Sequence, residues 1–450
     1  MSFRPSAQRL PIAIVSVLAL ASTAAAETLL YGVDAGVAES DNVTLVGTGK
    51  VSQTMAVADA DFDFKQQSRR LDVDAKGNFS YIDYLQNAYG GELTGRFDGL
   101  AHVALVPEHL TWALQDNFGQ AGLDPYTPMT PNNLENVNYV STGPDLALRF
   151  SANNFVNFSA RVARVQFDIS PYTSNRFLGR FAWGLQLSAH SSVSLNADTE
   201  RVLFENTVLN SDFERTNGFV RYELQGARTD FAADLGATTI SQSGAATSGP
   251  LARIELARKI STAAKLTASA GRDLTDSSTS FSGLQGGAIG LVGFAPAPQT
   301  ANNYTRTYAT VGWEYKRNRT TVAVSGRWEK DSYATQPLLD ATYGGGEFKV
   351  ERKLTRALSA QVVGRLYKTD FAHTVVTPVN GSSKFNDELI AAALTWRHGR
   401  GLEIRMRFEH NARVATAFDS GYRENRAILT VGYRPNAQPD ALQPDSDPGA

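Results

Sequence analysis

Hydrophobic and polar residues alternate with a period of two along much of this chain. In residues 71–81, apolar, small and aromatic side chains occupy the odd positions, while Asp72, Asp74 and Lys76 occupy even positions. Successive side chains of a β-strand point to opposite faces, so this segment is predicted to be a strand with one apolar and one charged face. The pattern recurs in residues 93–105, 177–189, 311–331 and 402–410. The chain is therefore predicted to be all-β.

The links between the predicted strands alternate between short and long. The short links are residues 66–70, 106–109, 151–154, 190–191, 226–229, 317–319 and 398–401. The long links are residues 43–53, 118–137, 168–175, 203–212, 241–249, 275–303, 332–341, 368–385 and 412–423. Transmembrane β-barrels have tight periplasmic turns and longer outer loops, whereas a soluble sandwich has no reason to separate its loops in this way. We therefore predict a single transmembrane antiparallel β-barrel of about 20 strands, with 18 as the alternative count.

The two ends of the chain do not fit the strand pattern. Residues 12–20 form a short apolar run that follows Arg4 and Arg9 and precedes three alanines at 24–26. A basic start, a short apolar stretch and a small-residue cleavage site are typical of a secretory signal peptide. We predict a cleaved signal peptide at residues 1–26, the barrel at residues 27–434, and a disordered periplasmic tail at residues 435–450, which has almost no apolar content.

Composition narrows the class of protein. The chain has no cysteine, which excludes a lipid-anchored mature N-terminus, a disulfide scaffold and thiolate zinc sites. The net charge of −2 gives no basic footprint, so no nucleic-acid partner is expected. A mean hydropathy of −0.25 is too low for a bundle of membrane helices. These properties and the export signal predict the outer membrane of a Gram-negative bacterium, with its lipid, its lipopolysaccharide and the barrel-assembly machinery as partners.

Charged side chains are expected on the inner face, because an arginine or lysine at the bilayer midplane costs about 2–4 kcal/mol. Strand periodicity then places Trp183, Leu185 and Leu187, as well as Leu402, Ile404, Met406 and Phe408, toward lipid. The candidate pore-lining residues on the opposite face are Asp59, Asp61, Asp63, Asp72, Asp74, Arg96, Arg176, Arg180, Arg221, Glu223, Arg327, Glu329, Glu347, Arg365, Glu403, Arg405, Arg407 and Glu409. Such a face is too charged for a dry core and predicts a wet lumen.

The candidate lumen charges are unevenly distributed, since the strands before residue 100 are mostly acidic and several later ones supply arginine. The two groups could face each other across the lumen, or each charge could pair with a neighbour on an adjacent strand, which is the favoured alternative. Aromatic residues near strand ends predict membrane-interface girdles. These are Tyr31, Tyr81, Tyr84, Trp112, Trp313, Tyr315, Trp328, Trp396, Tyr422 and Tyr433.

Two long loops have distinct compositions. Residues 122–136 are rich in proline, which lacks the N–H that a β-ladder needs, and residues 277–303 are rich in glycine, alanine and serine. We expect surface loops here, with a constriction inside the lumen or a cover over the outer mouth as the alternative.

No motif predicts an enzyme. The six histidines form no H-x-x-x-H pair, no G-x-S-x-G sequence is present, and the glycine-rich residues 286–293 lack the lysine of a phosphate-binding loop. We therefore predict no catalytic residue, no metal site and no cofactor.

Several turns and strand ends resemble those of a known family. Residues 32–43 (GVDAGVAESDNV) form a small-residue strand that ends in Ser40-Asp41-Asn42, residues 87–119 hold two strands around a V-P-E turn, and residues 130–150 join an Asn-rich loop to a strand that contains proline. These segments resemble the outer-membrane β-barrel family associated with PEP-CTERM and exopolysaccharide gene systems, within a broader group of β-barrel porins. In contrast to a barrel that ends on a terminal aromatic, this chain continues past Tyr433.

The resemblance implies a channel for exopolysaccharide export in capsule or biofilm formation, with polysaccharide and periplasmic export proteins as further partners. It carries over no catalytic residue. A general or small-solute porin and a non-conducting structural or adhesin-like barrel remain open as alternatives.

Overall fold

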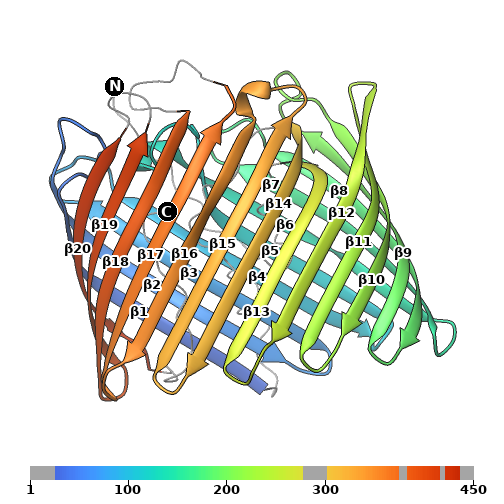
Figure 1. Cartoon of the computed structure of the whole chain (residues 1–450), viewed down its shortest axis with the longest axis horizontal. Helices are drawn as coiled ribbons and strands as arrows, with labels where there is room; N and C mark the ends of the chain where they lie inside the picture. Colours follow the sequence, from blue (N-terminus) through green and yellow to red (C-terminus); the bar gives the residue numbers. More distant parts are fainter. Residues whose placement is uncertain (1–25, 277–301, 374–382, 416–420, 436–450) are drawn as a thin grey trace.

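The computed structural model describes residues 26–276, 302–373, 383–415 and 421–435. They form one sheet of twenty strands, in which each strand pairs antiparallel with the next and β20 pairs with β1. The strands are β1 Ala26–Ser40, β2 Gln53–Gln67, β3 Leu71–Tyr84, β4 Glu92–Val106, β5 Leu110–Gly122, β6 Leu134–Arg149, β7 Asn154–Phe167, β8 Ser174–Ser188, β9 Ser191–Phe204, β10 Phe213–Gln225, β11 Thr229–Gln242, β12 Ala245–Lys259, β13 Ala264–Asp276, β14 Asn303–Arg317, β15 Thr320–Tyr333, β16 Ala341–Lys353, β17 Leu358–Phe371, β18 Lys384–His398, β19 Leu402–Ala415 and β20 Tyr422–Tyr433. The sheet closes on itself, as Figure 1 shows, so the predicted all-β barrel of about 20 strands is confirmed.

Some predicted segments lie outside the described residues. These are the signal peptide apart from Ala26, the tail after residue 435, and nearly all of the loop at 277–303. The first described residue, Ala26, begins β1. The only helices in the described parts are the short 3-10 turns η1, Pro131–Asn133, and η3, Pro337–Leu339. No helix there is long and apolar enough to cross a membrane.

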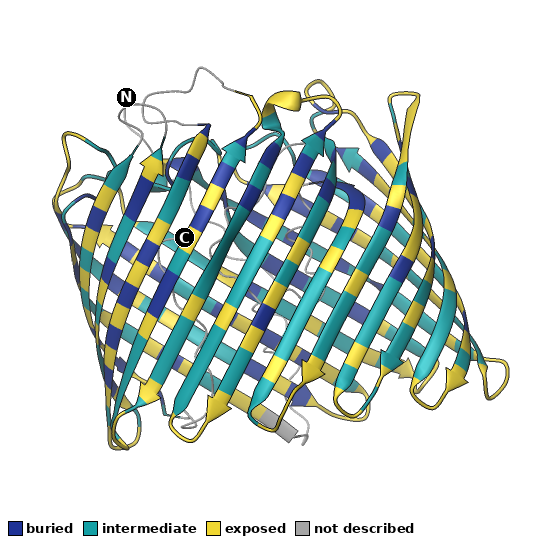
Figure 2. Ribbon diagram, viewed as in Figure 1, coloured by how far each residue is buried: buried dark blue, intermediate teal, exposed yellow. Residues whose placement is uncertain are grey.

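The period-two pattern of the sequence becomes an alternation of faces in the wall. Figure 2 shows exposed and more buried residues taking turns along the strands. The alternation arises because successive residues of a strand point to opposite faces, and the register of each strand pair fixes which side chains point inward.

Turn length separates the two ends of the barrel. The start of β1 and the end of β20 lie at the end of the barrel that has the short turns, such as 318–319 and 399–401. The longer links lie at the opposite end of the barrel. One expected long link is wrong. Residues 241–249 form a hairpin in which only Ser243 and Gly244 separate β11 from β12. Their φ angles of 51° and 80° suit the tight turn that matches strand twist, so the strands extend farther than the composition indicated.

The joint between the first and last strands is one of the two shortest in the ring, equal in number of residue pairs to the joint between β12 and β13. β1 and β20 share eight residue pairs, from Val33–Tyr433 to Ser40–Arg426, whereas β1 and β2 share fifteen. A Cβ at Gly36 would collide with the backbone of Leu429 and Thr430, so glycine is what lets the two strands approach here.

The sheet departs from a regular cylinder at β13. Residues 245–251 of β12 pair with β11 alone in the described structure, because the ladder between β12 and β13 begins at Ala252–Arg272. The end of β13 pairs only with β14 and extends into the lumen. There Leu274 packs with Val202 and Phe213, inner-face residues of β9 and β10.

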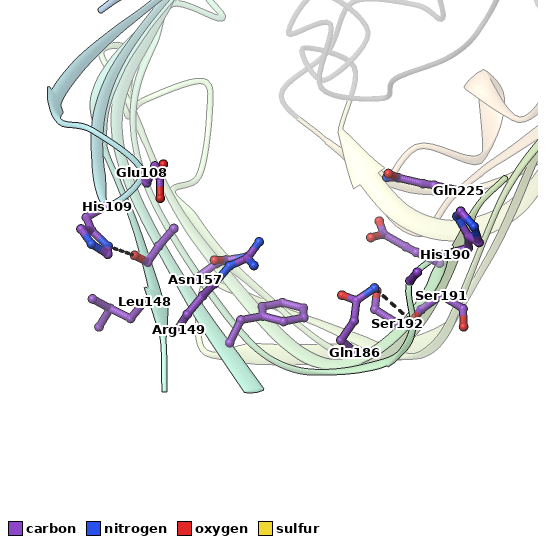
Figure 3. A pocket seen from close by; sticks show the side chains of 14 residues that line it. Glu108, His109, Leu148, Arg149, Asn157, Gln186, His190, Ser191, Ser192 and Gln225 are labelled. Atoms are coloured by element: carbon purple, nitrogen blue, oxygen red, sulfur yellow. Dashed lines mark hydrogen bonds between the residues drawn. The ribbon is translucent and has the colours of Figure 1, made fainter. Parts of the chain in front are cut away.

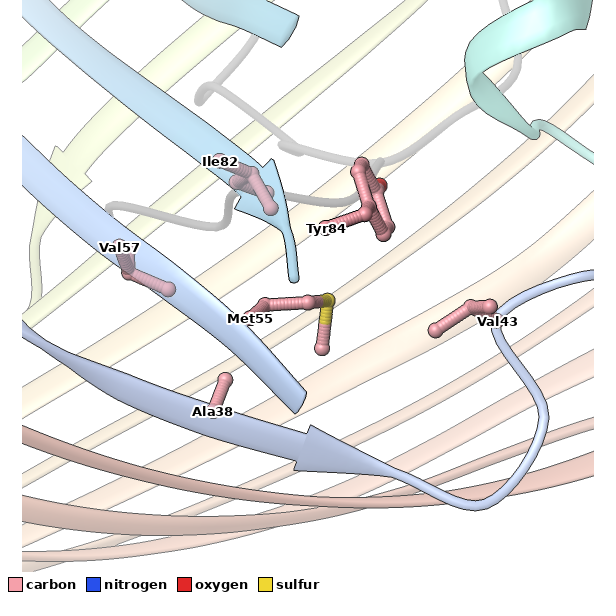
Figure 4. Close-up of a cluster of buried hydrophobic side chains, with 6 residues drawn as sticks. All are labelled: Ala38, Val43, Met55, Val57, Ile82 and Tyr84. Atoms are coloured by element: carbon pink, nitrogen blue, oxygen red, sulfur yellow. The ribbon is translucent and has the colours of Figure 1, made fainter. Parts of the chain in front are cut away.

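A small apolar cluster sits on the inner face near the long loops. It consists of Ala38, Val43, Met55, Val57, Ile82 and Tyr84. Figure 4 shows the Met55 side chain in the middle of this cluster, with Val57 and Ala38 on one side and Tyr84 and Val43 on the other. The girdle prediction is wrong for Tyr84, which is 7% exposed and faces inward, and for Tyr422, which shares the inner face with Arg413. The face of a residue depends on whether its position along the strand is odd or even, and not on how near it lies to the strand end.

Candidate functional site

The inner face carries all of the candidate pore-lining residues. Directly paired residues on neighbouring strands point to the same side, so the registers can be followed around the ring. This places on the inner face Asp59, Asp61, Asp63, Asp72, Asp74, Arg96, Arg176, Arg180, Arg221, Glu223, Arg327, Glu329, Glu347, Arg365, Glu403, Arg405, Arg407 and Glu409. That they line an open conduit stays a prediction.

Most of these charges are neutralised by close neighbours. The Arg365 Nε lies 3.0 Å from a Glu347 carboxylate oxygen on the adjacent strand. Glu403 accepts hydrogen bonds from Arg397 at 2.7 Å and from Arg405 at 3.2 Å. Local pairing of this kind leaves little net field across the lumen, and it keeps the wall polar.

One cluster of charged side chains joins strands that are not neighbours in the ring. Arg176 on β8 is 2% exposed and contacts Glu200 at 2.9 Å and Asp276 at 2.7 Å. Arg215 on β10 also pairs with Glu200 and lies 3.4 Å from Asp276. Asp276 ends β13, so this cluster fastens the inward end of that strand to β8 and β10. Arg176 therefore faces inward, but its guanidinium is enclosed rather than presented to solvent.

The wall formed by β2, β3 and β4 presents its charges openly. Asp74 lies 3.6 Å from both Lys65 and Lys76, and all three side chains are about half exposed. Arg96 and Asp98 pair at 2.6 Å with side chains 58% and 42% exposed. This side of the lumen offers water-accessible charges of both signs.

The proline-rich loop after β5 crosses the outer mouth. Tyr126 donates a hydrogen bond from its hydroxyl to the Leu338 carbonyl at 3.1 Å, and its ring centroid lies 4.5 Å from that of Phe371. Leu338 precedes β16 and Phe371 ends β17, on the far side of the twenty-strand ring from β5. The expected surface loop is therefore wrong, and the alternative of a loop folded over the lumen is what the structure has.

This loop has its own internal scaffold. Asn133 is buried, and its amide donates to the carbonyls of Asp124 at 3.0 Å and Pro128 at 3.1 Å. Asp124 in turn accepts from the backbone N–H of Tyr126 at 2.9 Å. Burial raises the pKa of Tyr126, and the nearby Asp124 carboxylate adds to the effect, so the hydroxyl stays protonated and donates. The sequence signal was present as two prolines, Pro125 and Pro128, which fix the backbone on either side of Tyr126.

The loop packs against a receptive patch of the opposite wall. Tyr343, Phe371 and Phe385 form its apolar part. Arg413 lies 3.8 Å over the Phe385 ring and is held by Asp387 at 2.7 and 2.9 Å. Sequence reasoning missed these residues as a group, because β5 and β17 are distant in the chain. Within the described residues, no group of three or more histidine or acidic side chains could hold a metal ion.

The outer face has the composition that a bilayer requires. Trp183 is 48% exposed, Met406 58% and Phe408 51%, all opposite the charged inner face. Closed β-sheets with an apolar outer band and a polar interior satisfy every backbone group within lipid. The chain is an integral outer-membrane β-barrel.

No family model and no curated protein matches this chain. Among solved structures, the barrel is similar to the FrpB iron transporter from Neisseria meningitidis (F5-1 variant), with a TM-score of 0.45 and 8% identity over 90% of this chain and 82% of that chain. It is similar to the copper transporter OprC, with a TM-score of 0.41 and 11% identity over 90% of this chain and 80% of that one. Acinetobacter baumannii OccAB3 has a TM-score of 0.36 and 8% identity over 91% and 99% of the two chains. Likeness at these identities has no bearing on cargo.

Proposed function

We propose that this barrel is a hydrophilic conduit that carries an exopolysaccharide outward across the outer membrane. The observation that carries the proposal is the inner wall, which is charged on nearly every strand and yet neutralised by pairs such as Arg365–Glu347. Paired charges offer hydrogen-bond donors and acceptors to hydroxyl groups without holding an ion strongly. A long neutral or weakly charged chain of sugars fits such a wall better than a simple ion does.

The sequence resemblance to the exopolysaccharide-associated barrels supports the same cargo. Polysaccharide and periplasmic export proteins are the partners that this proposal requires. No catalytic step belongs to it.

A small-solute porin is the second candidate. The loop that Tyr126 fixes to Phe371 supports it, because a loop across the mouth limits the width of anything that passes. In this second proposal the same wall would serve nutrients that diffuse inward. A non-conducting structural or adhesin-like barrel is the third candidate.

Gene deletion and planar-bilayer recording separate these candidates. Export of polysaccharide predicts that the deletion strain loses surface polysaccharide and regains it with the intact gene, whereas uptake of small nutrients is unchanged. The porin predicts the reverse pattern. Purified protein that inserts into bilayers but conducts no current, from a strain with unchanged polysaccharide, would leave only the structural barrel.

A further inference from the structure

A cavity of about 620 Å³ opens on the inner wall at the short-turn end of the barrel, the end that is predicted to face the periplasm. Figure 3 shows Glu108 and His109 on one side of it and His190, Ser191 and Gln225 on the other, with Arg149, Asn157 and Gln186 between them. Its residues come from the β4–β5 turn, the ends of β6, β7 and β8, the β8–β9 turn, the start of β9 and the end of β10. The volume lies within the range of ligand-binding pockets, which hold about 300–1,000 Å³.

The polar lining of this cavity differs from the rest of the wall. Half of the ten polar side chains that line it carry an amide or a hydroxyl, namely Asn157, Gln186, Ser191, Ser192 and Gln225. The other five are Arg149, the carboxylates of Glu108 and Glu223, and the histidines His109 and His190. Amides and hydroxyls both donate and accept hydrogen bonds, as sugar hydroxyls do. A patch of this composition is complementary to an uncharged polyhydroxylated ligand.

Several of these polar groups are available for a ligand. The side chains of Asn157, Arg149 and Gln225 have no hydrogen-bond or salt-bridge partner among the residues that the structure describes. Only the backbone groups of these residues are hydrogen-bonded within the sheet. Glu223 is paired with Arg221 at 2.7 Å and remains 40% exposed. By contrast, Gln186 is engaged with the carbonyls of Ser188 at 2.7 Å and Ser191 at 3.3 Å, so it shapes the turn.

An aromatic ring completes the cavity. Phe155 pairs with Gly184 across β7 and β8, and a Cβ at Gly184 would collide with three atoms of the Phe155 ring. The ring therefore covers the backbone at Gly184, and glycine is what allows it to lie against the wall. A ring held in this way presents apolar surface to the C–H face of a sugar beside the amides that bind its hydroxyls.

We propose that this cavity binds a neutral oligosaccharide segment at the periplasmic entrance of the barrel. The inference rests on the proposed export of polysaccharide and gives it a starting point, where the chain of sugars engages the wall before crossing. Two carboxylates against one arginine disfavour an anionic ligand, and the three amides favour a neutral one.

Binding is tested on the full-length protein in detergent with maltohexaose, by saturation-transfer difference NMR. Asn157→Leu and Gln225→Leu together remove two ligand hydrogen bonds and should weaken binding about tenfold. Neither side chain supports the wall, so both variants should still fold, which the heat-modifiable shift in gel mobility checks. Gln361→Leu is the matched control, because Gln361 is an inner-face amide near the short-turn end of β17, ten strands from β7 in the ring.

Each outcome bears on the assignment. Binding by the intact protein and the control, with loss in the double variant, supports it. No binding of maltohexaose, equal loss in the control, or tighter binding of trigalacturonate would overturn the neutral-sugar site. The proposed function fails separately: a deletion strain with unchanged surface polysaccharide contradicts export even where purified protein binds maltohexaose through Asn157.

Discussion

The cost of placing a charge at a residue of this wall depends on the face that the residue occupies and on its depth in the membrane. Phe408 lies near the middle of β19, faces outward and is 51% exposed. Ile404 shares its face but lies only two residues from the start of the strand. The cost of a charge on the lipid face falls from about 2–4 kcal/mol at the midplane to about 0–1 kcal/mol near the interface. Phe408 is therefore the sensitive position.

Phe408→Arg is expected to destabilise the barrel by about 2–4 kcal/mol, and Ile404→Arg by much less. Urea-induced unfolding in lipid vesicles measures both. Ser325→Arg is the control, because Ser325 lies mid-strand on the inner face opposite Glu347. Normal assembly of Phe408→Arg with failure of Ser325→Arg would mean that inside and outside are inverted.

Arg176 tests a different property, the enclosure of a charge. Arg176→Met leaves Glu200 and Asp276 buried with Arg215 as their remaining cluster arginine, so we expect a loss of about 3–5 kcal/mol in the free energy of unfolding. Adding Asp276→Leu should restore most of it, because the remaining Arg215–Glu200 pair is balanced. The same urea titration measures it. A single variant as stable as the wild type would contradict the fastening role.

Arg176 and Asp74 had the same status in the sequence, since each is a charge on the polar face of an alternating strand. The alternation of polar and apolar positions correctly predicted that both side chains lie on the inner face. It could not give their different environments, because the enclosure of Arg176 depends on Asp276, one hundred residues later. The candidate site at the outer mouth was missed for the same reason, since Tyr126 meets Phe371 only after the ring has closed.

Among the elements, the loop between β5 and β6 is the one that departs from its neighbours. It is stiffened by Asn133 and attached at its tip by Tyr126, so it behaves as part of the mouth rather than as an outer surface loop. Composition alone predicted a break in the ladder here, through its prolines. It could not predict the partner wall, which depends on how many strands intervene.

Tyr126→Ala removes the ring contact with Phe371 and the hydrogen bond to Leu338, which together are worth about 1–3 kcal/mol. If the barrel conducts, single-channel recordings should show higher conductance and more current noise as the loop detaches. Val208→Ala, in the exposed loop after β9, should change neither. Unchanged currents in Tyr126→Ala would mean that the loop does not limit the mouth.

The separation of turn lengths predicts the orientation of the whole molecule, with the long loops outside and the short turns in the periplasm. Because the chain has no cysteine, single introduced thiols report position without a background. Val208→Cys, at a side chain 92% exposed, should react with a membrane-impermeant maleimide on intact cells. Asn318→Cys, in a short turn, should react only after the outer membrane is opened. The opposite labelling would reverse the orientation.

The joint of eight pairs between β1 and β20 has a consequence for how the protein comes apart. A turn or loop of the chain connects every other pair of neighbouring strands. β1 and β20 are held together by noncovalent contacts alone. Heat should therefore separate β1 from β20 first. Val37→Cys with Leu429→Cys, paired outward-facing positions, would turn the chain into a covalent loop and raise the unfolding temperature under oxidising conditions. Calorimetry before and after reduction measures the difference, and no shift would mean that opening begins elsewhere. In a bridged barrel every pair of neighbouring strands is covalently linked. Such a barrel could unfold only by separating strands that a turn, a loop or the disulfide still joins.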